Sequence, residues 1–346
     1  MSGKGVTVRE QRRETMRRAN DGLERVGEIH RMVKALGRDQ AREIVAAEEK
    51  GIVDRVHDFL SDERHSIGIT YSGFCVVSFP HRQLKSKDDI WMRSQGPFSL
   101  LIEPGAVSKG KKIERLGVPF GSRARLIMLY LQTQALKTGS PEVEIGSSMH
   151  SWLDRMGLPI GGTAYKDVRE QAARISRCKL SFNWNGESEG VAWDGFQNDS
   201  IVQKGMNFHV PSAHDTLQTR LWEDTVRLSD TFYKALEAHP VPIWEPAVRQ
   251  ISNQSLAIDV YIWLAYRLRV IGEKPKLVPW ADLRDQFGPT YTRLRAFREN
   301  FVKTLKDVLA VYPEAKVEAS EQGLLLHRSP PAVPERKLMV LEGRKR

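Results

Sequence analysis

The amino-acid sequence predicts an α+β fold: tandem winged helix-turn-helix domains with an N-terminal helical extension. Two segments, 122–206 and 255–330, share one order of elements: an apolar helix, a short strand, a tryptophan-containing helix that stops at glycine, a basic helix and a hairpin. This order is typical of the winged helix-turn-helix, which places its last helix in a DNA groove. The formal net charge of +10 indicates a polyanionic partner such as nucleic acid, although charge alone fits a solvated basic surface equally well.

The 346 residues divide into five segments. We expect a basic, helical N-terminal extension over 1–66, a first winged-helix domain over 67–210, a connecting segment over 211–254, a second winged-helix domain over 255–333 and a basic tail over 334–346. In the extension, apolar residues recur at helical spacing from Leu23 onward. These helices could pack on the body, cover a partner or make a dimer contact, and we favour packing.

Extended structure is predicted at the start of the first domain. Residues 73–79 are rich in β-formers and end at Pro80. Residues 98–103 form a second predicted strand, which the turn formers Pro104 and Gly105 close. Both strands precede the first repeat and could extend its sheet.

The helices of the first repeat have start and stop signals. Ser122 is the predicted N-cap of the apolar helix, and Gly139 is its predicted end. Ser147 or Ser148 is expected to cap the helix that contains tryptophan. After the basic helix, a long hairpin around 186–190 is the candidate wing.

The basic helix of the first repeat has two faces. Its apolar residues recur at helical spacing and predict a face that packs on the domain: Ala164, Val168, Ala172 and Ile175. The remaining positions are rich in cations, and arginine can bridge O6 and N7 of guanine while lysine and arginine neutralise phosphates. The predicted DNA contacts are Tyr165, Lys166, Arg169, Arg174 and Arg177. An ordinary solvated helix face is the alternative.

The second basic helix repeats this division. Its apolar stripe comprises Leu294, Phe297, Phe301, Leu305 and Val308. Its predicted DNA contacts are Arg293, Arg295, Arg298, Lys303 and Lys306. This helix could instead bind only the DNA backbone. In the two wings, Lys204 and Arg328 are further candidates for contacts with flanking phosphates.

Enzyme chemistry has little support in the sequence. Residues 105–112 approach the P-loop pattern, but a lysine stands where a hydroxyl residue should ligand Mg²⁺, so a basic linker is the better account. The closest histidine pair, His209 and His214, is interrupted by Pro211 and does not form the metal motif of a nickase. The two cysteines have no metal-site spacing. We therefore expect no enzyme activity, no cofactor and no metal.

Membrane insertion is not expected. The longest strongly apolar run, 126–131, is far shorter than the roughly 20 residues that span a bilayer. The N-terminus has no apolar stretch typical of a signal peptide. The expected location is the cytoplasm.

The sequence resembles the RepA family of plasmid-encoded replication initiators over roughly residues 70–333. In the first repeat the matching residues are Pro119-Phe-Gly121, Arg125, Gln132-Thr133, Ala135, Thr138-Gly-Ser140, Ile145-Gly146, Gly157, Arg169-Glu-Gln171 and Arg174. In the second they are Asp259-Val-Tyr261, Trp263-Leu-Ala-Tyr-Arg-Leu268, Trp280, Leu283, Gln286-Phe-Gly288, Phe297 and Tyr312-Pro313. Because both repeats match in order, the resemblance is fairly specific.

The resemblance implies an initiator that binds repeated double-stranded DNA sites at a plasmid origin, helps to open the duplex and recruits host replication proteins. Such initiators often also repress their own gene, commonly as homodimers, while monomers bind the origin repeats. The match at Arg169 and Arg174 implies that the first basic helix reads the sequence. The implied location is the bacterial cytoplasm, in association with plasmid and nucleoid. The alternative is a tandem winged-helix transcription regulator without an initiation role.

Overall fold

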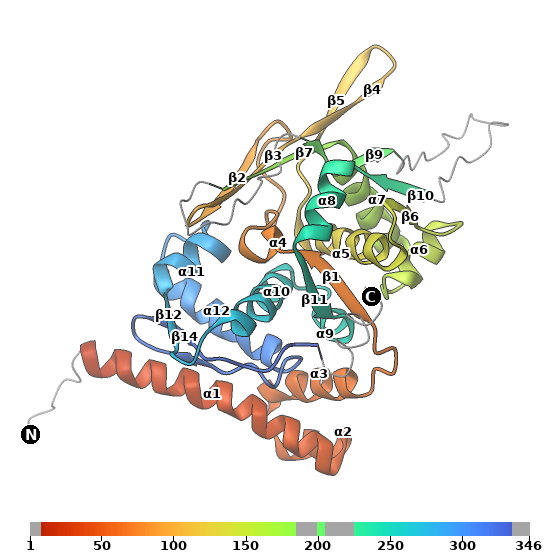
Figure 1. Cartoon of the computed structure of the whole chain (residues 1–346). Coiled ribbons are helices and arrows are strands. Elements are labelled where there is room, and N and C mark those ends of the chain that lie inside the picture. Colours follow the sequence, from red (N-terminus) through yellow and green to blue (C-terminus); the bar gives the residue numbers. More distant parts are fainter. Residues whose placement is uncertain (1–7, 185–198, 205–224, 334–346) are drawn as a thin grey trace, which may run out of the picture. The chain divides into compact units, whose positions relative to one another are not determined.

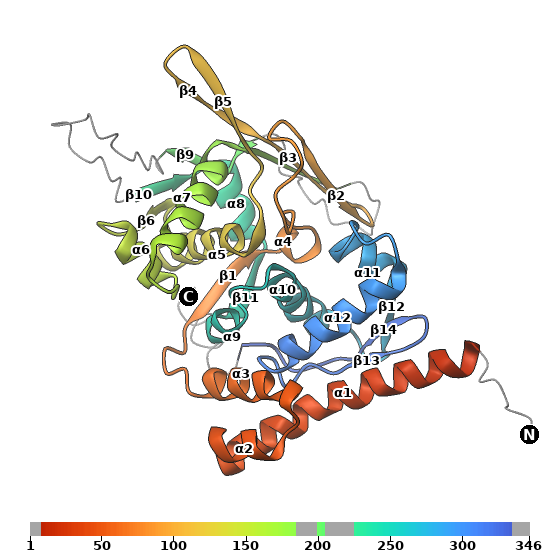
Figure 2. The same cartoon turned by 180° about the vertical axis from the view of Figure 1, so that it is seen from behind.

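The computed structural model describes residues 8–184, 199–204 and 225–333. They are a mixture of helices and strands (Figures 1 and 2). The chain forms two compact units, each described here by itself. The described residues of the terminal unit are 8–67, 243–251 and 256–333, and those of the central unit are 68–184, 199–204, 225–242 and 252–255. The chain passes between the units within β1 (Ile67–Tyr71) and again within β11 (Pro240–Trp244).

The terminal unit joins the N-terminal helices to the second repeat. Its helices are α1 (Val8–Leu36), α2 (Arg38–Ile44), the 3-10 helix η1 (Ala47–Glu49), α3 (Lys50–Leu60), α9 (Glu245–Gln250), α10 (Ser255–Val270), α11 (Trp280–Phe287) and α12 (Leu294–Leu309). Its strands are β12 (Lys276–Pro279), β13 (Val317–Ala319) and β14 (Gly323–Leu326). They form an antiparallel sheet in the order β12-β14-β13.

An aromatic cluster forms the core of the terminal unit around α12. The ring of Phe301 lies 5.6 Å from that of Phe287, 5.4 Å from that of Phe297 and 6.1 Å from that of Trp280. Buried aromatic pairs at such distances contribute about 0.5–1.5 kcal/mol beyond the area they bury. The apolar side of α12 therefore fastens it to α11.

The N-terminal extension packs on the terminal unit, which is the alternative that we favoured. Figures 1 and 2 show α1 running alongside α12. The Asn20 side chain donates to the Ala319 carbonyl at 2.8 Å and accepts from the Ala319 amide at 2.7 Å, so it covers the open edge of β13. Farther along α1, His30 Nε2 lies 2.8 Å from the Ala310 carbonyl.

The central unit contains the first repeat and the strands before it. Its helices are α4 (Gly73–Val76), α5 (Gly121–Thr138), α6 (Met149–Arg155), α7 (Gly162–Arg177) and α8 (Asp230–Ala238). Its remaining strands are β2 (Trp91–Gln95), β3 (Phe98–Glu103), β4 (Gly105–Lys109), β5 (Lys112–Gly117), β6 (Glu142–Glu144), β7 (Lys179–Trp184), β8 (Asp199–Ser200), β9 (Val202–Lys204) and β10 (Thr225–Leu228). They form the sheets β2-β3-β7-β8, β6-β10-β9 and β4-β5.

Three expectations for the first repeat are confirmed. Gly139 ends α5 in the left-handed conformation, with φ of 66°. The Ser148 hydroxyl accepts from the Ser151 amide at 3.1 Å and caps α6. Residues 98–103 form β3, as predicted.

The predicted strand over 73–79 is wrong, because residues 73–76 form the short helix α4. Phe74 packs its ring 5.1 Å from that of Phe182 and 6.4 Å from that of Tyr71. Gly73 lies so close to these two rings that a β-carbon there would collide with them. Tertiary packing thus overrides the β-propensity of this segment.

Two further expectations need correction. Ser122 is not the N-cap, because α5 begins one residue earlier, at Gly121, and Phe120 is its N-cap. Phe120 is held at this position by its amide, which donates to Gln171 Oε1 of α7 at 2.8 Å. The segment over 105–112 is no simple linker, because it forms most of the hairpin β4-β5.

Both repeats have their described helices and strands in the expected order. β7 pairs with β8, which is part of the candidate first wing, but its turn around 186–190 lies outside the described residues. In the second repeat, β13 pairs with β14. The winged helix-turn-helix assignment and the five domain boundaries stay predictions.

Candidate nucleic-acid interface

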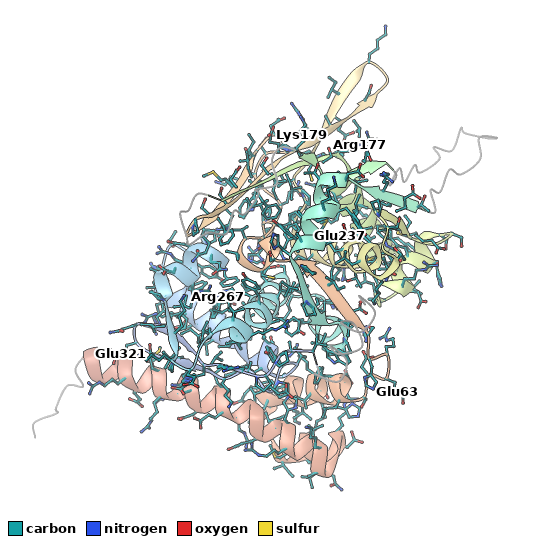
Figure 3. All side chains as sticks on the ribbon, in the orientation of Figure 1. Glu63, Arg177, Lys179, Glu237, Arg267 and Glu321 are labelled. Atoms are coloured by element: carbon teal, nitrogen blue, oxygen red, sulfur yellow. The ribbon has the colours of Figure 1, made fainter. Side chains whose placement is uncertain are left out.

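Helix α7 has the two faces that its sequence predicts. Val168, Ala172 and Ile175 are fully buried, and this apolar face packs within the central unit. Lys166 and Arg177 are exposed. Figure 3 marks Arg177 beside Lys179, an exposed cation that the sequence reasoning did not select although it directly follows the helix. The exposed side of α7 therefore presents cations to an approaching polyanion.

Arg174 does not lie on this exposed side, and its prediction as a DNA contact needs correction. It is 4% exposed. Its Nη1 donates to the Val118 carbonyl at 3.0 Å, and its Nη2 donates to Glu170 Oε1 at 2.6 Å. The guanidinium also lies 4.9 Å from the centre of the Phe120 ring. Because these partners use both terminal nitrogens, Arg174 holds the segment that leads into α5.

Tyr165 and Arg169 are half-buried flanking residues of α7. The Tyr165 hydroxyl lies 3.3 Å from His150 Nδ1, which links α7 to α6. These two side chains border the exposed cations without being fully open to solvent. Their predicted DNA contacts stay predictions.

The two wing candidates lie at strand ends. Lys204 is the last residue of β9, where it pairs with Arg227 of β10. Arg328 is exposed just after β14. Their contacts with DNA stay predictions.

Helix α12 also has its predicted core stripe, in which Phe297, Phe301, Leu305 and Val308 are fully buried. Three of its predicted DNA contacts are exposed: Arg293, Arg295 and Lys303. Arg295 is paired with Glu299 at 2.9 Å, a surface ion pair that solvent weakens.

Helix α1 takes up part of the polar side of α12. The Arg298 guanidinium lies 5.5 Å from the Trp280 ring centre and donates to the Glu321 carbonyl at 3.0 Å. These contacts hold the Arg298 side chain against the terminal unit. Lys306 is half-buried, and its ammonium lies directly over Gly22 of α1. Arg295 and Arg298 line, together with Arg18 of α1, a pocket of about 1000 Å³. The two basic helices therefore have different neighbours, since α1 lies over part of the polar side of α12.

Buried thiols are the other notable titratable groups near α7. Cys178 follows the helix directly and is fully buried; burial raises the pKa of its thiol to about 12. Burial also raises the pKa of the Cys75 thiol. Both thiols therefore stay protonated and poorly reactive at neutral pH.

Within 8–184, 199–204 and 225–333, no group of three or more His, Cys, Asp or Glu side chains is placed to hold a metal ion. In the same part of the chain, none of the helices combines the length and the apolar character that crossing a bilayer requires.

Comparison with protein families shows that residues 118–280 fit the family described as "Plasmid encoded RepA protein". This segment includes α5, α6 and α7. Comparison with curated proteins finds no match. The family match supports a replication-initiator role.

Solved structures similar to the chain include two of domains 2 and 3 of RctB. One, of selenomethionine derivatives, has a TM-score of 0.44 and 11% identity, covering 75% of this chain and 95% of that one. The other has a TM-score of 0.37 and 13% identity, covering 72% and 84%.

Proposed function

We propose that this chain, whose residues 118–280 fit the family of plasmid-encoded RepA proteins, initiates plasmid replication by binding repeated double-stranded DNA sites at an origin. It opens the duplex there and recruits host replication proteins. It acts in the cytoplasm without enzymatic activity of its own, and as a dimer it represses its own gene.

The observation that carries this proposal is the two-faced helix α7 within the matched segment. Its buried side is fixed to the central unit, while Lys166 and Arg177 are exposed. A helix held in this way can enter a major groove and place arginine against guanine. In this proposal the first repeat is a winged helix-turn-helix whose α7 reads the sequence.

The second repeat has a smaller share of the binding. Arg298 and Lys306 are engaged by the Glu321 carbonyl and by α1, which leaves Arg293, Arg295 and Lys303 exposed on α12. Because α1 covers part of the polar side of α12, the cations that remain exposed at its edge are better placed to contact phosphates than base edges. We assign α12 to backbone contacts, which was the alternative that the sequence left open.

Footprinting on the DNA that flanks the gene identifies the cognate repeat, and titration of duplexes that contain it tests whether α7 reads the sequence. Arg177→Ala should cost on the order of 1–3 kcal/mol of binding free energy on the cognate repeat and less on random duplex. Lys303→Ala on α12 is the matched control, and it should weaken both duplexes alike. Equal losses on both duplexes for Arg177→Ala would make that residue a phosphate contact and contradict the assignment.

Replication itself separates an initiator from a transcription regulator. A mini-plasmid that carries the repeats should replicate in a host when this protein is supplied, and the Arg177→Ala variant should lower its copy number. Specific binding and repression without replication would favour the regulator. Incubation with supercoiled DNA should leave it unnicked, and cleavage would contradict the non-enzymatic role.

A further inference from the structure

The hairpin β4-β5 is a basic arm that projects from the central unit. Figures 1 and 2 both show it extending beyond β3 and β7. We propose that this hairpin binds duplex DNA immediately beside the segment that α7 contacts. The inference rests on the proposed function, and it adds a DNA-binding element that the sequence suggested only as a linker.

The base of the hairpin is fastened to the last turn of α7. Gly105 and Gly117 pair at the base. Gly105 lies against the Arg177 carbonyl and Gly117 against the Arg174 guanidinium, so a β-carbon at either position would collide with α7. Gly117 also has φ of 82°, which favours glycine. The direction of the arm is therefore tied to the helix that we assign to the groove.

Two ion pairs support the same arm from the side. Lys87 Nζ lies 3.6 Å from Glu114 Oε1, and Arg115 Nε lies 3.2 Å from Asp88 Oδ1. Exposed pairs of this kind stabilise little, but both join β5 to the segment before β2. Glu114 is the single acidic residue of the sequence from 105 to 117, and this pair offsets its charge.

The tip of the hairpin has the chemistry of a polyanion contact. A two-residue turn, Gly110-Lys111, joins the strands, and Gly110 has φ of 62°. Lys111 and Lys112 are exposed, and neighbouring Ile113 is 78% exposed. Lysines at an extended tip can neutralise phosphates, and an apolar side chain beside them can lie against the sugars of a groove wall.

The dimensions of the arm fit duplex DNA. A two-stranded ribbon enters a major groove. The five residues of β4 span roughly 17 Å at about 3.3 Å per residue, which equals the rise of about five base pairs. The hairpin should therefore reach the flank on one side of the segment that α7 reads.

Salt-dependent binding to two duplexes tests the proposal. One duplex is trimmed to the repeat, and the other is extended by ten base pairs on each side. The double variant Lys111→Ala/Lys112→Ala should make the negative log–log salt slope shallower by about 2 on the extended duplex and leave it unchanged on the trimmed one. The matched control is Lys50→Ala/Lys234→Ala, which removes two exposed lysines from α3 and α8 and should change neither slope.

Tethered cleavage locates the arm on the DNA. Cys75 and Cys178 are buried, so a single Ser108→Cys can carry an iron-EDTA label. It should cut one flank, within about five base pairs of the repeat. The same label on Lys234→Cys should leave that flank intact.

The outcomes separate this inference from the proposed function. In one outcome the wild type binds specifically, while Lys111→Ala/Lys112→Ala leaves the salt slope unchanged on both duplexes and the label cuts no flank. This result would contradict DNA binding by the hairpin and leave the proposed function intact. Absence of binding to either duplex by the wild type would overturn both.

Discussion

Single side chains decide which cations of α7 face outward. Arg174 and Gln171 belong to the residues that resemble the RepA family, and the structure uses both to hold the segment before α5. Gln171 Oε1 accepts from the Phe120 amide at 2.8 Å, and Arg174 donates to the Val118 carbonyl at 3.0 Å. In this structure both side chains therefore position the segment before α5 against α7.

Arg174→Ala should therefore lower the stability of the protein. The Val118 carbonyl loses a buried donor, which typically costs about 1–3 kcal/mol. Urea denaturation measures this loss. Lys166→Ala, at an exposed position of the same helix, should change the free energy of unfolding by less than about 0.5 kcal/mol. Unchanged stability of Arg174→Ala together with weaker DNA binding would instead restore the original prediction of a DNA contact.

At the scale of elements, α1 determines how much of α12 is available. It contacts α12 and β13 and is anchored by Asn20 at one position and by His30 at another. His30 is 4% exposed, and its ring lies edge-on to that of Phe59 at 6.3 Å. Burial lowers the pKa of His30, because the charged ring would lose water. The docking of α1 thus depends on a neutral imidazole.

The stability of the protein should depend on pH through His30. In the unfolded chain its pKa is about 6.5, so acid protonates the unfolded state first. The stabilisation is complete above about pH 6.5 and is lost as the pH falls below that value. His30→Gln keeps a donor for the Ala310 carbonyl and cannot titrate.

Urea midpoints between pH 7.5 and 5.5 compare the two proteins. The wild type should lose more stability over this range than His30→Gln. The difference between the proteins isolates this residue from His239, whose pKa burial also lowers. Parallel pH curves for the two proteins would contradict the assignment.

For the whole molecule, the two repeats are unequal. The central unit presents Lys166 and Arg177 on α7 and carries the basic hairpin beside them. The terminal unit places α1 along α12. Two copies of one element order therefore lead to basic helices with different neighbours, the hairpin β4-β5 at the end of α7 and α1 along α12.

DNA affinity of the whole protein should fall steeply with salt. Each phosphate neutralised by lysine or arginine contributes roughly −0.9 to the slope of log affinity against log salt concentration. The formal net charge of +10 favours several such contacts. Fluorescence anisotropy with a labelled duplex measures the slope, and a flat response would exclude the proposed DNA binding.

The sequence by itself determined the parts that depend on local periodicity and turn chemistry. The buried stripes of α7 and α12 follow from the helical repeat of 3.6 residues, and the ends at Gly139 and Ser148 follow from capping. It also indicated the family of the segment 118–280.

Only the tertiary structure decided which cations stay exposed. Arg174 is buried because the segment 117–120 lies against it, and Lys306 is half-buried because α1 passes over it. In the same way, the rings of Tyr71 and Phe182 surround α4, although its residues favour a strand. Exposure and packing depend on segments far away in the chain, and local sequence spacing carries no information about them.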